Sequence, residues 1–155
     1  MPTSITIALD IMSGDNGPQP ALFGAIKSLE SLQDLKIILV GDEKLINQNI
    51  DASMQNRVSI LHTDEYIRMD ENIVNAIRNK KNSSMRLAVN CVKEARAQAC
   101  VSAGNTGALM SISKIILKTI KGIDRPAICT SLPTKKKFMQ VLDLGANIEC
   151  NAQNL

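Results

Sequence analysis

The chain has 155 residues, of which 45% are hydrophobic and 21% charged, and its formal net charge is +3. This composition is typical of a soluble globular chain and excludes a disordered, collagen-like or fibrous protein. With three aromatic residues and no Trp, the chain lacks the stacking surfaces of single-stranded nucleic-acid binders, and no hydrophobic run is long enough to cross a bilayer.

The hydrophobic pattern switches repeatedly between the period of a strand and that of a helix. Pro20 suits the first turn of the first helix, and Gly122 is expected to end the last one. Strands that alternate with helices indicate a mostly parallel sheet covered on both faces, hence the α/β class. In chain order the pattern predicts strands at 5–9, 35–40, 58–61, 99–102, 126–131 and 138–142, and helices at 21–29, 42–47, 85–92 and 109–120.

The C-terminal part of the chain has two further features. Lys135–Lys137 is the only charge run and lies between two predicted strands, so we expect a solvated hairpin turn there. Residues 150–155, CNAQNL, resemble the opening of a helix rather than an end. We therefore expect the chain to be the first part of a longer protein.

The segment ACVSAGNTGALM, residues 99–110, joins a predicted strand through a glycine turn to an amphipathic helix. Such a turn presents N–H groups and the positive end of the helix to a ligand, which favours an anion. Gly104 and Gly107 would allow positive φ or a close approach, and Asn105 and Thr106 would supply side-chain hydrogen bonds. The turn is neither a Walker A loop nor a dinucleotide fingerprint. A purely structural turn with a polar cap explains the pattern equally well.

Two more polar glycine turns follow predicted strands. DIMSGDNGP offers Asp10 and Asp15, and LDLGAN offers Asp143 and Asn147. Each turn alone is ordinary turn chemistry. Because open α/β sheets bind ligands at the carboxyl ends of their strands, the three turns together favour a shared pocket.

A basic stretch, AIRNKKNSSMRLAV, leads into the third predicted helix. Asn82 or Ser83 is expected to cap that helix, and a capped helix start beside several cations suits a phosphate. The alternative is a solvated basic surface with an ordinary cap. The two G-x-x-G stretches of the chain enclose Asp-Asn and Asn-Thr rather than basic residues, which argues against a KH-type RNA clamp.

The four cysteines, Cys91, Cys100, Cys129 and Cys150, form no C-x-x-C pair, and the single histidine, His62, cannot complete a Cys/His zinc spacing. We expect reduced, mostly buried structural thiols and no metal. His62 lies in a polar segment without a nucleophile motif, so a Ser-His-Asp or Cys-His mechanism is disfavoured.

Taken together, these motifs resemble the phosphate acyltransferase family of bacterial phospholipid synthesis (the PlsX family of acyl-carrier-protein:phosphate acyltransferases). One departure is Ser13, where the family usually has glycine. Members of the family carry a substantial second half, so the resemblance implies that residues 1–155 are the N-terminal part of a single α/β acyltransferase domain. The matching strings are ALDIMSGDNGP, KNSSMRLAV, ACVSAGNTGALM, GIDRPA and VLDLGANIEC, of which GNTGALM and LDLGAN are the most specific.

The resemblance implies transfer of a fatty acyl group from its carrier-protein thioester to inorganic phosphate, giving acyl-phosphate. It also implies a three-layer α/β/α fold like that of phosphotransacetylases and isocitrate dehydrogenases, incomplete in this chain. A homodimer, a cytoplasmic location with peripheral membrane association, and no cofactor are further implications.

In such a reaction phosphate is itself the nucleophile, so no acylated Ser or Cys is needed. We expect Asn105 and Thr106, with backbone donors around them, to cradle the phosphate or stabilise the oxyanion. Asp10 or Asp15 would orient or deprotonate a phosphate oxygen. The other expected phosphate or substrate contacts are Gly14, Ser84, Ser102, Gly104, Gly107, Asp143, Gly145 and Asn147.

Two alternatives stay open. The first is a phosphotransacetylase-like enzyme that uses coenzyme A, and the second is a non-catalytic module that binds phosphate or docks a carrier protein. The isolated chain is expected to be inactive as an acyltransferase, because a sheet that stops as a helix begins leaves hydrophobic faces uncovered.

Overall fold

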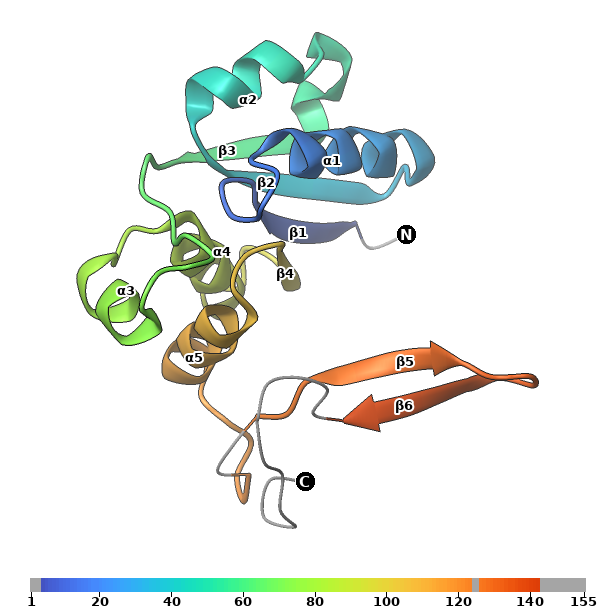
Figure 1. Ribbon diagram of the computed structural model, residues 1–155. Coiled ribbons are helices and arrows are strands. Elements are labelled where there is room, and N and C mark those ends of the chain that lie inside the picture. Colours follow the sequence, from blue (N-terminus) through green and yellow to red (C-terminus); the bar gives the residue numbers. More distant parts are fainter. Residues whose placement is uncertain (1–3, 124–125, 143–155) are drawn as a thin grey trace. The chain divides into compact units, whose positions relative to one another are not determined.

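The computed structural model describes residues 4–123 and 126–142 (Figure 1). The chain divides into two compact units, Met1–Leu117 and Lys118–Leu155. The expected contacts Asp143, Gly145 and Asn147 lie outside the described residues, as does Cys150.

The first unit contains a parallel four-stranded sheet. Its strands are β1 (Ile5–Asp10), β2 (Leu35–Gly41), β3 (Val58–His62) and β4 (Ala99–Ser102), in the order β3-β2-β1-β4. Asp10 at the end of β1 is in register with Val40 of β2 and with Ser102 of β4. The carboxyl ends of three strands therefore share one edge, where the expected site residues gather.

Helices cover both faces of this sheet, which confirms the three-layer α/β/α arrangement (Figure 1). Alternate side chains of β2 are buried on opposite faces of the sheet. Ile37 and Leu39 pack with α1, whereas Ile38 and Val40 pack on the opposite face with α4. A strand buried on both faces reads as a continuous hydrophobic run. The helical elements are α1 (Gln19–Ser31), α2 (Glu43–Asn49), the 3-10 helix η1 (Ala52–Arg57), α3 (Ile73–Asn79), α4 (Ser84–Lys93) and α5 (Thr106–Leu117).

Most helix starts follow local sequence signals. Pro20 lies in the first turn of α1, as expected, and Asp42 caps α2 by accepting hydrogen bonds from the N–H groups of Lys44 and Leu45. Two elements, α3 and η1, were not predicted. Both are short, and Asn72, which caps α3, is also an ordinary loop residue.

The end of α5 corrects one expectation. The helix ends at Leu117, and the following Lys118 takes the left-handed conformation with φ of 70°. Gly122 also has positive φ, at 89°, but it belongs to a separate turn in which Ile123 N–H donates to Ile120. Gly122 is therefore not the cap of α5, because the chain leaves the helix four residues earlier.

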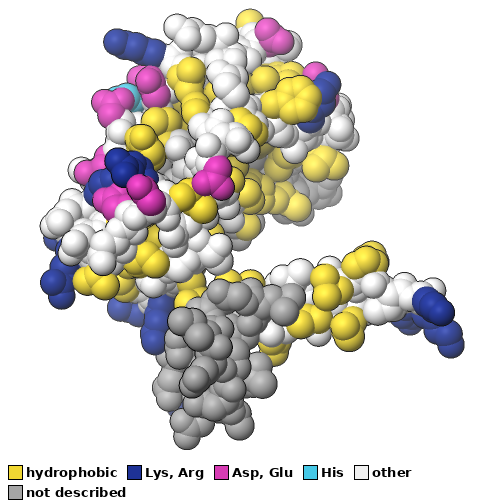
Figure 2. All heavy atoms as spheres, viewed as in Figure 1, with side chains coloured by type: hydrophobic (Ala, Val, Ile, Leu, Met, Phe, Trp, Pro, Cys, Tyr) yellow, Lys and Arg dark blue, Asp and Glu magenta, His cyan; other side chains and the backbone are white. Residues whose placement is uncertain are grey.

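In the second unit, β5 (Cys129–Pro133) and β6 (Phe138–Leu142) form an antiparallel pair. The sequence predicted this first strand at 126–131, but the strand spans residues 129–133, because these are the residues that pair with β6. The predicted hairpin turn is confirmed: Thr134 N–H donates to the carbonyl of Lys137, and the three lysines lie at the tip of the hairpin (Figure 2).

The described cysteines are all free thiols. Cys91 is buried and Cys100 is half-buried, and burial raises the pKa of both thiols. Cys129 is exposed, contrary to expectation, because it lies in a two-stranded sheet whose residues are mostly solvent-accessible. Among the described residues, no helix has the length and hydrophobicity needed to cross a membrane.

Candidate functional site at the carboxyl edge of the sheet

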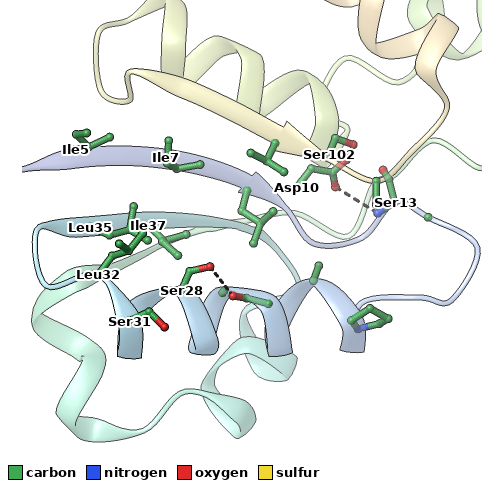
Figure 3. A pocket seen from close by; sticks show the side chains of 18 of the residues that line it. Ile5, Ile7, Asp10, Ser13, Ser28, Ser31, Leu32, Leu35, Ile37 and Ser102 are labelled. Atoms are coloured by element: carbon green, nitrogen blue, oxygen red, sulfur yellow. Dashed lines mark hydrogen bonds between the residues drawn. The ribbon is translucent and has the colours of Figure 1, made fainter. Parts of the chain in front are cut away.

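Asp10, the last residue of β1, is the buried polar centre of this edge, with no exposed surface. Its Oδ1 accepts hydrogen bonds from the N–H groups of Met12, at 3.1 Å, and Ser13, at 3.3 Å. Its Oδ2 accepts the hydroxyl of Ser102, at 2.7 Å (Figure 3). The carboxylate thus fixes the turn that follows β1 and ties it to the end of β4.

The hydrogen-bond chain continues into the GNTG turn. Ser102 Oγ donates to Asp10 and accepts the N–H of Gly104, at 3.1 Å. Three expected site residues are therefore linked in one network. Because Asp10 is buried and already accepts three hydrogen bonds, it holds this network in place.

The glycines of the two turns permit a close approach of backbones. A Cβ on Gly104 would lie 2.6 Å from both Ser13 Cβ and Met85 Cε. Gly14 has φ of +120°, and a Cβ there would lie 3.3 Å from the carbonyl oxygen of Ala103. Gly104 and Gly107 are not among the residues with positive φ, so close packing, and not backbone freedom, explains the glycine at position 104.

Asn105 organises the start of α5. Its Oδ1 accepts the N–H of Ala108, at 3.0 Å, which is a helix cap. Its Nδ2 donates to the carbonyl of Met69, also at 3.0 Å. Within the described residues, the N–H groups of Thr106 and Gly107 have no acceptor, so they are the donors left for a ligand at this helix end.

Asp15 and Gly14 line a small pocket of about 360 Å³ together with residues 66–70. Asp15 is exposed. Arg68 forms an ion pair with Asp70, N···O 2.8 Å, and its hydrogen bond and charge lower the pKa of the Asp70 carboxyl. Because Asn105 binds the carbonyl of Met69, this segment is fastened to the GNTG turn. The segment has no periodic pattern, so sequence reasoning missed it.

A larger groove of about 960 Å³ opens beside α1. Figure 3 shows Asp10, Ser13 and Ser102 at one end, and Ile5, Leu35 and Leu32 toward the other. Its walls are mainly hydrophobic side chains of β1, β2 and α1, so the polar network borders a hydrophobic surface.

The N-terminus of α4 departs from expectation. Ser83 occupies the cap position, but its side chain makes no capping hydrogen bond, and the N–H of Asn82 instead donates to Oε2 of Glu65, at 2.8 Å. Ser84, an expected contact, is the first helical residue and is buried.

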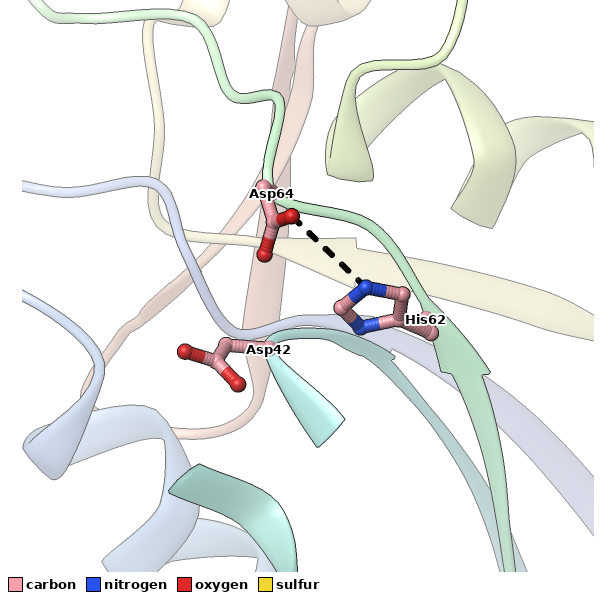
Figure 4. A group of neighbouring side chains, drawn as sticks. All are labelled: Asp42, His62 and Asp64. Carbon is pink, nitrogen blue, oxygen red and sulfur yellow. Dashed lines mark ion pairs between the residues drawn. The ribbon is translucent and has the colours of Figure 1, made fainter. Parts of the chain in front are cut away.

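Asp42, His62 and Asp64 form a separate cluster whose ligand atoms lie within 4.8 Å of one another (Figure 4). His62 Nε2 lies 3.7 Å from Asp64 Oδ2, and its Nδ1 accepts the N–H of Glu43. Asp42 Oδ1 caps α2. Asp42 is half-buried and the other two residues are exposed, and Asp42 and His62 each already accept a hydrogen bond at the start of α2, so we assign no metal to this cluster.

Comparison with known proteins identifies the family. Over 157 aligned residues the chain is 49% identical to a phosphate acyltransferase of Shewanella baltica (strain OS155) and 48% identical to one of Shewanella sp. (strain ANA-3). Each match covers 99% of this chain and 46% of the relative, so the chain spans about half the length of the curated relatives it matches. The family model described as "Fatty acid synthesis protein" matches residues 5–155, and the chain therefore belongs to that family.

Proposed function

We propose that the chain is the N-terminal part of an enzyme domain that transfers a fatty acyl group from acyl-carrier protein to inorganic phosphate. The observation that carries the proposal is the start of α5. There, Asn105 holds a helix end with two available N–H donors beside the Asp10–Ser102–Gly104 network. The name of the relatives, phosphate acyltransferase, supports the same reaction.

The chemistry needs no enzyme nucleophile. A phosphate oxygen attacks the thioester carbonyl carbon and forms a tetrahedral oxyanion. The oxyanion collapses with cleavage of the C–S bond, and the leaving thiolate takes up the proton that the phosphate gives up. Preorganised N–H donors stabilise such an oxyanion. The N–H groups of Thr106 and Gly107 are suited to this charge, and Asn105 positions them through its cap.

The two aspartates take different roles in this proposal. Asp15 is exposed at the small pocket and is the candidate for orienting or deprotonating phosphate. Asp10 is a positioning residue, because its oxygens hold Ser102 and the turn after β1. Gly14 shapes the turn against Ala103. Asp143, Gly145 and Asn147 complete the proposed set of substrate contacts.

The finer attributes of the enzyme belong to the same proposal. It acts in the cytoplasm as a homodimer, associates peripherally with the membrane, and uses acyl-carrier protein rather than coenzyme A as the donor. The hydrophobic groove beside the polar network is compatible with a lipid-derived substrate.

The test uses a chimaera in which residues 1–155 replace the matching part of the Shewanella baltica relative. With acyl-carrier-protein thioester and phosphate, the chimaera should form acyl-phosphate, measured by trapping with hydroxylamine. The isolated chain should form none. A folded chimaera that prefers acyl-coenzyme A would support the phosphotransacetylase-like alternative, and one inactive with both donors would refute acyl transfer.

A further inference from the structure

Two buried serines with unsatisfied hydroxyl groups lie at the start of α4. Ser83, at the cap position, and Ser84, the first helical residue, both have 0% of their surface exposed. Among residues 4–123 and 126–142, neither Oγ finds a hydrogen-bond partner. A buried hydroxyl without a partner is unfavourable, so a pair of them at one helix end points to an absent polar ligand.

Backbone donors lie at the same turn. The N–H of Ser84 donates to the carbonyl of Glu65, at 2.8 Å, and the N–H of Leu87 donates to the carbonyl of Ser83. In the part of the chain that the structure describes, no acceptor receives the N–H of Met85 or Arg86. The first turn of a ten-residue helix thus offers two hydroxyls, two N–H groups and the positive end of the helix dipole.

The charges around this turn are mostly positive. Arg86 is half-buried and anchored by a long contact to the carbonyl of Ile77, and Lys81 is exposed. Lys80 is nearby in sequence but is paired with Glu71. Glu65 carries the opposite charge, and its carboxylate accepts the N–H of Asn82 just before the helix.

The turn also adjoins the proposed reaction site. Met85, the second residue of α4, and Ser13, in the turn after β1, both contact the position that a Cβ would take on Gly104. The helices α4 and α5 pack against each other (Figure 1). Gly104, which lies just before α5, therefore connects the N-terminus of α5 with that of α4 through its packing against Met85.

We propose that the first turn of α4 binds an oxygen of inorganic phosphate through the hydroxyls of Ser83 and Ser84 and the free N–H groups. The N–H groups at the start of α5 then remain available to stabilise the tetrahedral oxyanion of the proposed reaction. The identification of the anion as phosphate rests on the proposed function. Because the carbonyl of Glu65 accepts the N–H of Ser84 and its carboxylate accepts the N–H of Asn82, phosphate enters in this proposal by displacing the Glu65 carboxylate from Asn82.

The experiment measures phosphate binding to the chain by calorimetry and thermal unfolding, with phosphate titrated against chloride at constant ionic strength. Phosphate should raise the Tm of the wild type more than chloride does. Ser83→Ala and Ser84→Ala should each raise the Tm without phosphate, because an unpartnered hydroxyl is removed. Each should also weaken phosphate binding by roughly tenfold or more, the effect of losing a hydrogen bond to a charged group.

Ser59→Ala is the control, since it removes an exposed hydroxyl on β3 that lines neither pocket. It should leave both the Tm and the phosphate affinity nearly unchanged. The proposal is overturned if the wild type does not distinguish phosphate from chloride, or if both α4 variants retain wild-type phosphate affinity.

Acyl transfer by the chimaera separates this site from the proposed function. If Ser84→Ala transfers acyl groups with an unchanged KM for phosphate, the site is wrong and the function stands. If phosphate binding depends on Ser83 and Ser84 but no acyl-phosphate forms, the site stands and the function is wrong.

Discussion

The hydroxyl of Ser102 donates a 2.7 Å hydrogen bond to Oδ2 of Asp10, across 92 residues of sequence. The two residues end neighbouring parallel strands, and β1–β4 pairing places them in register. This bond joins the two glycine turns that carry the candidate site, so its loss should affect both the stability and the geometry of that edge.

Replacing Asp10 by Ala should destabilise the chain strongly. The N–H groups of Met12 and Ser13 and the hydroxyl of Ser102 would lose their acceptor, at a cost of about 1–3 kcal/mol for each donor left buried and unpaired. Urea unfolding measures the loss. Asp51→Ala is the surface control, because Asp51 is exposed and makes no capping bond. Equal stability of the two variants would contradict the assigned role of Asp10.

Asn105→Ala should cost about 1 kcal/mol of stability through the lost cap of α5. In the chimaera it should also lower acyl-phosphate formation, since the N–H groups of Thr106 and Gly107 are no longer held in place; loss of a preorganised oxyanion donor costs about 10²–10³ in rate. Asn105→Asp is the variant to compare with it. It retains the cap acceptor but loses the donor to Met69, so it should keep most of the stability. If Asn105→Ala forms acyl-phosphate at the rate of the unmodified chimaera, the turn has only a structural role.

The sequence predicted the alternation of strands and helices well, because hydrophobic period is a local property of the chain. It also placed Asp10, Ser102 and Gly104 at one sheet edge, because parallel strands end on the same side. It could not predict the partners of Asn105, since Met69 lies in a segment without periodicity. Nor could it predict that Ser83 occupies the cap position without using its side chain, because that depends on the packing of the Glu65 segment over α4.

Two glycines of the GNTG turn should respond differently to alanine. In Gly104→Ala the new Cβ would lie 2.6 Å from Ser13 Cβ. Because the Ser13 Cβ is bonded directly to the backbone, it cannot move aside, and the variant should be clearly destabilised. In Gly107→Ala the new Cβ meets only the end of the Ile73 side chain, at 2.9 Å, and the tip of Asn105, at 3.4 Å. Both side chains can shift, and Ala favours the helix, so stability should change little. Thermal unfolding compares the two, and a larger loss for Gly107→Ala would reverse the packing argument.

The pair formed by Lys80 and Glu71 should contribute to stability in a pH-dependent way. The hydrogen bond from Lys80, N···O 2.6 Å, lowers the pKa of the Glu71 carboxyl below its ordinary value of 4.5. A lowered carboxyl pKa stabilises the fold above the unfolded-state pKa, and this contribution is lost as pH falls through the folded-state value. Lys80→Gln should therefore lose stability at neutral pH and show a shallower decline below about pH 4.5. Urea unfolding across this range checks it, with Lys81→Gln as control. Parallel pH profiles for the two variants would contradict the prediction.

The thiols should differ in reactivity according to their burial. Because burial raises the pKa of Cys91 and Cys100, both remain protonated at neutral pH, and the thiolate is the reactive form. Of the three described thiols, Cys129 is exposed and should be alkylated by iodoacetamide first, with Cys91 protected until the chain unfolds. Mass spectrometry of a time course identifies the order.

The same burial predicts how cysteine substitutions act. Cys91 packs between α4 and the sheet with Ala8, Ile38 and Val40, so Cys91→Ala in the chimaera should lower the Tm and leave turnover per folded molecule nearly unchanged. Cys129→Ala, at an exposed position, should change neither quantity. Because phosphate is the nucleophile in the proposed reaction, no thiol carries the acyl group. A stable Cys91→Ala or Cys100→Ala chimaera with abolished turnover would instead indicate an acyl-thioester intermediate on the enzyme, and trapping of that intermediate by mass spectrometry would decide the matter.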